Sequence, residues 1–338
     1  LRQNSDYQLV WDVKTAYPTS DYPMGLKFVR HNTYEFYKEL ASAKVIIENT
    51  NIVERLYAYK KKEQFLLQTW HGSLGIKRLD GDVVMGFRWK QLAKRCQKTV
   101  DYLLSNSNFE TEVFRTAYWK DVPSILVGHA RNDIFFIKDQ EKVARINKKV
   151  HRFLNIDEDT HIFLFAPTHR DDVDESYQPL NYEMIKEALE ERFGGKWQIV
   201  IRLHNRLKKE SRSWLNLLPS YVSDATFYED MQELLLCTDV GLTDYSSWIF
   251  DFVLSGKPGF IIELNLEDYE NARGFYYPID TTPFPIATSS EELADNIRKF
   301  DAEKYAKDKD VFLAARGCME DGHASERIVE KINELMAK

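Results

Sequence analysis

Short apolar runs recur along the chain, and a polar loop follows each of them. With their loops, the runs cover residues 43–50, 65–72, 101–107, 123–133, 161–171, 197–206, 238–247 and 257–263. Runs of this length between turn-forming residues are typical of strands buried on both faces of a parallel sheet. Amphipathic segments lie between them at 181–195, 230–239 and 290–300, with Gly, Asp and Ser in capping positions. The alternation predicts an α/β fold with parallel sheets.

A charged helical segment near residues 138–158 leaves four strand candidates before it and four after it. Two Rossmann-like halves are the simplest arrangement for this order. We therefore expect an N-terminal domain over residues 1–140, a C-terminal domain over 151–311 and a terminal helix over 312–338, with the N-terminal domain as its candidate packing partner. The sequence begins at Leu1 rather than Met, which suggests a piece of a longer protein whose first domain is truncated at its start.

The composition is that of an ordinary globular protein, with 43% hydrophobic and 29% charged residues. A net charge of −7 argues against a broad nucleic-acid footprint, which needs clustered positive charge. No apolar run reaches membrane-spanning length, and no secretory signal pattern opens the chain. The three cysteines lie far apart and show neither metal nor disulfide spacing. A reducing cytoplasm fits this pattern.

Four of the eight histidines stand at or just after the end of an apolar run: His71, His129, His169 and His204. In an open α/β sheet, ligands bind outside the carboxyl ends of the strands, so these four have the placement of site residues. We expect the other four to be structural or at the surface. No His-x-x-x-His or Cys-x-x-Cys pair is present, and the sequence therefore predicts no metal site.

The stretch LTDYSSWIFDF, residues 242–252, places polar residues between two apolar runs. It predicts a strand end, a tight turn and the start of a helix, which Ser246 or Ser247 could cap. Two hydroxyls beside unpaired helix amides would suit a phosphate group. The alternative is a plain capped helix that packs Trp248 and its apolar neighbours into the core. The residues alone leave both interpretations open.

Six motifs occur in a characteristic order: QTWHGSLGIK (68–77), GHARND (128–133), APTHRDD (166–172), IRLHN (201–205), LTDYSSWIFDF (242–252) and GKPGFII (256–262). With them, the chain resembles the CDP-glycerol glycerophosphotransferase family, which includes teichoic acid primases and polymerases and related capsule polymer synthases. The resemblance runs from about residue 65 to about residue 327.

The family implies a GT-B fold, in which two Rossmann-like domains face a central cleft. It also implies transfer of an alditol phosphate from a CDP-alditol to an acceptor hydroxyl, with release of CMP and without a metal or other cofactor. Glycerol phosphate is the favoured group and ribitol phosphate the second possibility. The acceptor would be a lipid-linked or polymeric polyol phosphate or glycan, and the enzyme would work peripherally at the cytoplasmic face of the membrane.

The same resemblance assigns roles to individual residues. His71 would be the general base that takes the proton of the acceptor hydroxyl. His204 would bind the donor pyrophosphate and stabilise the leaving CMP. The remaining residues expected to bind the donor are Arg202, Ser246, Ser247, Thr168, Asp244 and His169. His169 stands where many members have another residue, so it is either a ligand contact or a packing substitution. Arg131 and Asp133 would form a structural ion pair at the domain junction.

A basic segment at residues 83–98 departs from the acidic character of the chain, since it contains five cations and no acid. Arg88, Lys90, Lys94 and Arg95 are its candidates for contacting an anionic acceptor or the anionic inner leaflet of the membrane. The alternative is an amphipathic helix whose basic face is simply solvated.

Two other functions compete with the alditol phosphotransferase. A GT-B glycosyltransferase that uses a nucleotide sugar would share the fold and the phosphate site. A non-catalytic module that binds an anionic polymer would need neither the histidine of the TWHG motif nor that of the RLH motif. The presence of both motifs favours an enzyme.

Overall fold

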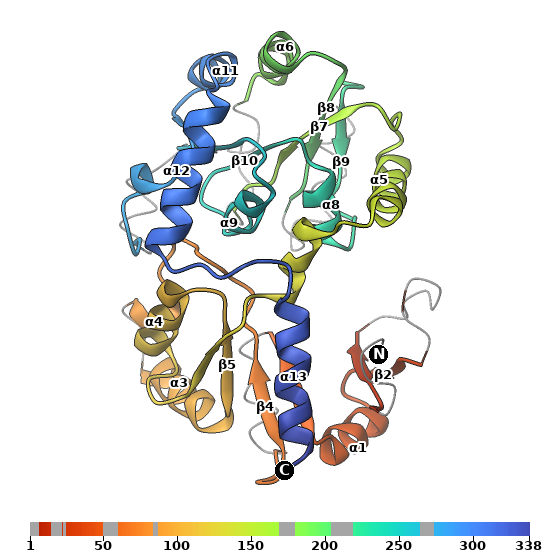
Figure 1. The fold of residues 1–338 in the computed structure, drawn as a ribbon, viewed down its shortest axis with the longest axis vertical. Coiled ribbons are helices and arrows are strands. Elements are labelled where there is room, and N and C mark those ends of the chain that lie inside the picture. The colour runs from red at the N-terminus through yellow and green to blue at the C-terminus, as the bar shows by residue number, and fades with distance from the viewer. Residues whose placement is uncertain are drawn as a thin grey trace.

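A computed structural model describes residues 7–14, 22, 25–49, 60–83, 87–168, 180–203, 219–263 and 274–338. These residues form two α/β lobes, one above the other in Figure 1. The upper lobe contains the middle of the chain, and the lower lobe contains the N-terminal part together with the last helix.

The upper lobe is built on a six-stranded sheet with the order β12-β11-β10-β7-β8-β9, and every pair in it is parallel. Its strands are β7 (His161–Phe165), β8 (Trp197–Ile201), β9 (Val222–Asp224), β10 (Val240–Thr243), β11 (Gly259–Ile262) and β12 (Ile286–Ala287). Counted along this lobe, the order is 6-5-4-1-2-3, which is the doubly wound Rossmann order. The predicted parallel α/β fold is thus confirmed.

Helices cover both faces of this sheet. They are α5 (Gln140–Leu154), α6 (Tyr182–Phe193), α8 (Met231–Cys237), α9 (Trp248–Phe252), α11 (Ser290–Arg298) and α12 (Ala302–Ala315), with short 3₁₀ turns η6 (Val253–Ser255) and η7 (Ile279–Thr281). Alternate residues of β7 enter different cores, since Phe163 packs with α6 and α11 while Ile162 packs with α5 and α8. Burial on both faces explains why the strands appear in the sequence as continuous apolar runs.

The lower lobe has a four-stranded parallel sheet with the order β3-β4-β5-β6. Its strands are β3 (Val45–Glu48), β4 (Phe65–Gln68), β5 (Tyr102–Ser105) and β6 (Ser124–Leu126). The accompanying helices are α1 (Tyr34–Ser42), η2 (Asp80–Asp82), α3 (Phe87–Thr99), α4 (Asn108–Ala117) and η3 (Ala130–Phe136). A separate parallel pair, β1 (Val10–Val13) and β2 (Lys27–Arg30), lies beside α1.

The last helix, α13 (Ala324–Met336), returns to the lower lobe (Figure 1). Ile328 packs against Leu104 of β5 and Val127 after β6, so α13 covers the face of this sheet opposite to α1. The carboxylate of Asp133 caps α13, because it accepts hydrogen bonds from the backbone N–H groups of Ala324 and Ser325 at 3.0 and 2.8 Å.

Polar side chains begin several helices as the sequence patterns suggest. Asp230 accepts from the N–H groups of Gln232 and Glu233 at the start of α8. Ser289 caps α11, one residue earlier than expected, because the hydroxyl of Ser290 accepts instead from the N–H of Asn181. Gly194 ends α6 at a φ of 72°, a conformation that glycine adopts without strain.

A segment of the lower lobe crosses into the upper one. After β4, Leu74 and Ile76 are 0% and 1% exposed, and both belong to the upper lobe's core. Beyond them, Lys77 forms an antiparallel bridge with Phe275, and the N–H of Tyr276 donates to the carbonyl of Ile76 at 2.8 Å. The carboxyl ends of β4, β7 and β10 therefore face the same junction, which is the GT-B arrangement.

Among the helices of these described ranges, none has both the length and the apolar composition needed to cross a membrane.

Replacing Leu74 with Ala tests whether the crossing segment holds the lobes together. The change removes a fully buried side chain from the upper core, and we expect it to lower the free energy of unfolding by about 2–5 kcal/mol. Leu126→Ala is the control, because Leu126 is 37% exposed and should cost less than about 1 kcal/mol. Urea denaturation followed by fluorescence measures both, and equal effects would contradict this role of Leu74.

Candidate active site

The upper lobe's strand order reverses between β7 and β10, which are neighbours in the sheet. Ligands of doubly wound folds bind at such a switch point, outside the carboxyl ends of the strands. Thr168 follows β7 and Asp244 follows β10, so both lie at this position.

Asp244 joins the two turns at the switch point. Its side chain is 1% exposed, and Oδ1 accepts hydrogen bonds from the N–H groups of Thr168 at 2.7 Å and Tyr245 at 2.6 Å. Thr243 adds a third link, because its hydroxyl donates to the carbonyl of Ala166 at 2.9 Å. Asp244 thus orients backbone at the switch point, and these bonds fix the positions of the residues that follow it.

Ser247 is the N-cap residue directly before α9, but its hydroxyl makes no capping hydrogen bond. The expectation that a serine side chain caps this helix is therefore wrong. The apolar residues behind it are buried as expected, with Ile249 and Phe252 at 1% and 0% exposure. Trp248 is partly buried and donates through Nε1 to the carbonyl of Ala166 at 2.7 Å. The Ser247 hydroxyl thus lies beside the switch point without serving as the helix cap.

The lower lobe brings its crossing segment against these turns. A Cβ atom built on Gly75 would lie 3.2 Å from Cβ of Ser247, so only a residue without a side chain allows this close approach comfortably. Lys77 Nζ donates to the Thr168 hydroxyl at 2.9 Å. The structure thus places an ammonium group beside Thr168. Sequence reasoning missed Lys77, although it is the only lysine or arginine in the motif at 68–77.

His71 follows the carboxyl end of β4 and is exposed. Its Nδ1 lies 2.7 Å from the carbonyl oxygen of Asn49, and its ring stacks on Trp70 with centroids 4.2 Å apart. A carbonyl oxygen only accepts, so Nδ1 carries a proton, and in the neutral form of the ring Nε2 would be the basic nitrogen.

The backbone at Trp70 turns sharply to present His71. Its φ is 54°, a left-handed conformation that costs a non-glycine residue about 1–2 kcal/mol. The side chain of Gln68 offsets part of this cost by accepting from the N–H of Trp70 at 2.8 Å. His71 and Gly75 are four residues apart, a span of at most about 14 Å. The basic nitrogen and the serine turn thus belong to one region of the junction.

Arg202, expected at the donor phosphate, has a different environment. Its Nη1 donates to the carbonyls of Ala225, at 3.2 Å, and Tyr228. Burial lowers the pKa of the Arg202 guanidinium, although Asp230 and Asp224 oppose the shift. Within the described chain, these bonds give Arg202 a structural role in the loop after β9.

Two candidates, His204 and His169, lie outside the described residues. In the basic segment, α3 forms as expected, but the side chains of Arg88 and Lys90 also lie outside the description. Lys94 and Arg95 are exposed, and Phe87 at the start of the helix is 77% exposed.

Two interpretations from the sequence are wrong. His129 follows β6 but is 3% exposed and bonds through Nε2 to the buried carboxylate of Glu110, 3.0 Å away, so it is structural. Arg131 pairs with Asp251, with Nε 2.8 Å from Oδ2, and not with Asp133. The carboxylate of Asp133 instead caps α13, as described above.

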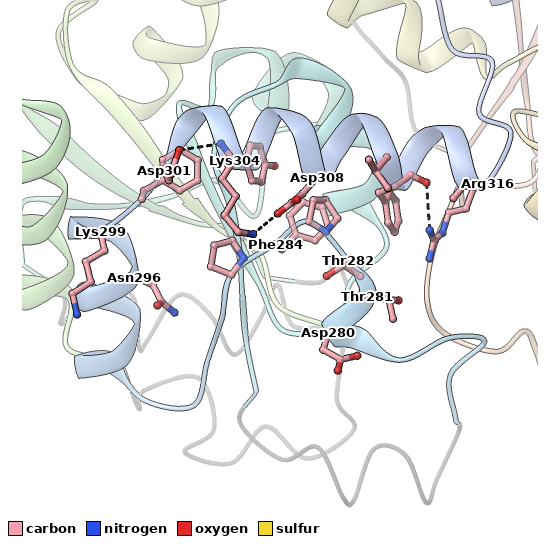
Figure 2. Close-up of a pocket in the computed structure, with 17 residues that line it drawn as sticks. Asp280, Thr281, Thr282, Phe284, Asn296, Lys299, Asp301, Lys304, Asp308 and Arg316 are labelled. Atoms are coloured by element: carbon pink, nitrogen blue, oxygen red, sulfur yellow. Dashed lines mark hydrogen bonds and ion pairs between the residues drawn. The ribbon is translucent and has the colours of Figure 1, made fainter.

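In the part of the chain that the structure describes, no three histidine, cysteine or carboxylate side chains gather where they could hold a metal ion. Figure 2 shows a groove of about 740 Å³ between α12 and the segment around η7. Of its basic residues, Lys304 is paired with Asp308 and Lys299 with Asp295, and none of the predicted site residues line the groove. The groove is therefore separate from the site at the lobe junction.

Several known proteins are similar to this chain along most of its length. The chain is 30% identical to the teichoic acid glycerol-phosphate transferase of Staphylococcus aureus, over 98% of this chain and 87% of that protein. It is 29% identical to the teichoic acid poly(glycerol phosphate) polymerase of Staphylococcus epidermidis, over 97% of this chain and 46% of that protein. It is 26% identical to the teichoic acid poly(ribitol-phosphate) polymerase of Bacillus spizizenii, over 80% of this chain and 44% of that protein. The chain thus spans about half the length of these two polymerases.

Among solved structures, the wall teichoic acid polymerase TagF superposes with a TM-score of 0.80 at 27% identity, covering 98% of this chain and 82% of that one. A TagF variant soaked with CDPG gives a TM-score of 0.79 at 26% identity, covering 99% and 82%. The family described as CDP-Glycerol:Poly(glycerophosphate) glycerophosphotransferase matches residues 1–334. The protein therefore belongs to this family of CDP-glycerol-using transferases.

Proposed function

We propose that this chain transfers an alditol phosphate from a CDP-alditol to an acceptor hydroxyl and releases CMP, in the synthesis of teichoic acid or a related polymer. The observation that carries the proposal is the juxtaposition at the lobe junction. His71 supplies a basic nitrogen from the lower lobe, while Lys77 and Thr168 meet beside the serine turn of the upper lobe.

In the proposed reaction, the acceptor hydroxyl gives its proton to Nε2 of His71 while its oxygen attacks the phosphorus that carries the alditol. A new phosphodiester P–O bond forms, the pyrophosphate P–O bond breaks, and its electron pair leaves with CMP. Such transfers depend on positioning and on positive charge near the phosphoryl oxygens. Lys77 provides the charge, and Thr168, Ser246 and Ser247 provide hydroxyl donors.

The proposal retains His204 as a partner of the leaving CMP, from the family motif alone. It includes no metal cofactor, because Lys77 and His204 would supply the positive charge that a metal otherwise brings. Glycerol phosphate is the favoured group, since the two relatives at 29% and 30% identity are both named for glycerol phosphate. Ribitol phosphate remains the second candidate, and turnover of a UDP-sugar would instead support a glycosyltransferase.

We also propose that α3 binds the cytoplasmic leaflet of the membrane or an anionic, lipid-linked acceptor there. Lys94, Arg95 and Lys98 are exposed on this helix, and the exposed ring of Phe87 stands at its start. Basic residues beside an exposed aromatic side chain suit an anionic interface, where the ring enters the headgroup region.

His71→Ala tests the base. We expect kcat for CMP release from CDP-glycerol or CDP-ribitol to fall by about 10²–10⁴-fold, because the acceptor hydroxyl loses the group proposed to take its proton. His323→Ala is the control, since His323 is exposed and its ring pairs with Glu326 at the start of α13. The assay includes UDP-sugars and an EDTA-treated sample. An unchanged rate in His71→Ala would refute the proposed mechanism, and inactivation by EDTA would refute its metal independence.

Lys77→Met tests the donor site. A charged hydrogen bond contributes about 1.5–3 kcal/mol, so we expect the affinity for CDP-glycerol to fall by roughly 10–150-fold. Arg78→Met, the neighbouring cation that donates through Nε to the carbonyl of Phe275, is the matched control. Titration calorimetry measures both variants, and equal affinities in wild type and Lys77→Met would remove Lys77 from the donor site.

Replacing Lys94, Arg95 and Lys98 with Gln tests the membrane face. Each basic residue near an anionic surface contributes about 1 kcal/mol, so binding to phosphatidylglycerol vesicles should weaken roughly a hundredfold. The control changes the exposed cations Lys142, Arg145 and Lys148 of α5 to Gln. Sedimentation with vesicles at two salt concentrations provides the measurement. If both triple variants lose binding equally, α3 has no special role.

A further inference from the structure

We infer that Arg131 is a positioning residue for His71, which holds the loop after β4 and ties it to helix α9 of the other lobe. This inference rests on the proposed role of His71 as the base. In this role, Arg131 would hold the backbone of the loop that carries His71 and would contact no reacting atom.

The contacts of Arg131 reach both sides of the junction. Nη2 donates to the carbonyl of Gly72, the residue directly after His71. Nε and Nη2 donate to the two carboxylate oxygens of Asp251, at 2.8 and 3.2 Å. Asp251 lies in α9, four residues after Ser247. One planar guanidinium thus connects the loop of the base to the element that follows the serine turn.

The carboxylate of Asp251, which accepts the hydrogen bonds of Arg131, is held by further contacts from both lobes. Asp251 is 6% exposed, and its carboxylate also accepts from Nδ2 of Asn132 at 3.1 Å and from Nε2 of Gln232 at 3.4 Å. Burial alone would lower the pKa of Arg131, but the charge of Asp251 raises it overall, so the guanidinium stays protonated. The hydrogen bonds that Arg131 donates are therefore not lost through deprotonation of its guanidinium.

A second contact holds the same loop. Nδ2 of Asn106 donates to the Ser73 hydroxyl at 2.7 Å and to Oε1 of Glu320 at 3.0 Å. Nδ2 of Asn132 donates to that same Glu320 oxygen at 2.9 Å. Gly72 and Ser73 are thus both tied to one buried network, while the His71 ring beside them is exposed.

Loss of Arg131 would release the Gly72 carbonyl and let the preceding residue rotate. The bond from Nδ1 of His71 to the Asn49 carbonyl would then no longer be enforced, and the ring would lose its single tautomer. A lysine cannot substitute, because its single ammonium cannot span a carbonyl and both carboxylate oxygens in one plane.

The first test uses protein labelled with ¹⁵N-histidine and reads the His71 tautomer from its ring ¹⁵N shifts. We expect a single Nδ1–H tautomer in the wild type and a mixture in Arg131→Lys and in the charge-balanced pair Arg131→Gln/Asp251→Asn, which removes both charges of the ion pair together. Asp133→Asn, which alters only the cap of α13, should retain the wild-type spectrum. A single Nδ1–H tautomer in both Arg131 variants would overturn the inference. The tautomer measurement requires no catalysis, so it tests the role of Arg131 even if CDP-alditols are not the donor substrates.

The second test is kinetic. A misplaced base should reduce kcat by roughly 10–100-fold while KM for CDP-glycerol stays within about threefold. Adding Arg131→Lys to His71→Ala should cause no further loss, because a residue that works through His71 has nothing left to position. The positioning role would be overturned if the double variant lost kcat by the product of the two single losses. It would also be overturned if Arg131→Lys changed only KM. Asp133→Asn should leave both constants unchanged.

Discussion

The site depends on the burial of Leu74 and Ile76 of one lobe in the core of the other. These side chains belong in sequence to the loop after β4, but their contacts belong to the Rossmann sheet above. Because apolar burial is non-directional, it brings the segment across without specifying its orientation. The backbone bridge at Lys77 and the hydrogen bonds at Gly72 and Ser73 supply that orientation.

This division of labour explains how a site can be built from two lobes. The switch point of the upper sheet is formed by the turns after β7 and β10. Lys77 of the lower lobe adds a positive charge to it through its hydrogen bond to Thr168. His71 would be an ordinary surface residue if the Asn49 carbonyl did not set its tautomer. The crossing segment of the lower lobe carries both His71 and Lys77, so these groups meet the turns of the upper lobe where the chain crosses.

Most of the strands that the sequence revealed are largely buried, as in β4, β5, β7, β8, β10 and β11, and their apolar runs made them recognisable; β3 and β6 were also recognised although they are partly exposed. The edge strands β9 and β12 have three and two residues, too few for any periodicity to show. The carboxyl-end position of His71 followed from the sheet architecture, and the family motif pointed to Ser247. The partner of Arg131 did not follow, because Asp251 lies 120 residues away and the near neighbour Asp133 offered a simpler pair. The partner of the His71 ring is a backbone carbonyl, which no side-chain pattern records.

The return of α13 to the lower lobe also has a consequence for biosynthesis. Of the two larger sheets, that of the lower lobe is synthesised first, and among the described residues α13 packs on one of its faces. The apolar positions around Leu104 and Val127 therefore remain uncovered by α13 until the second lobe has been translated. The second lobe is therefore translated before α13 can cover the sheet of the first lobe. This order is the reverse of the usual one, in which the N-terminal domain folds first.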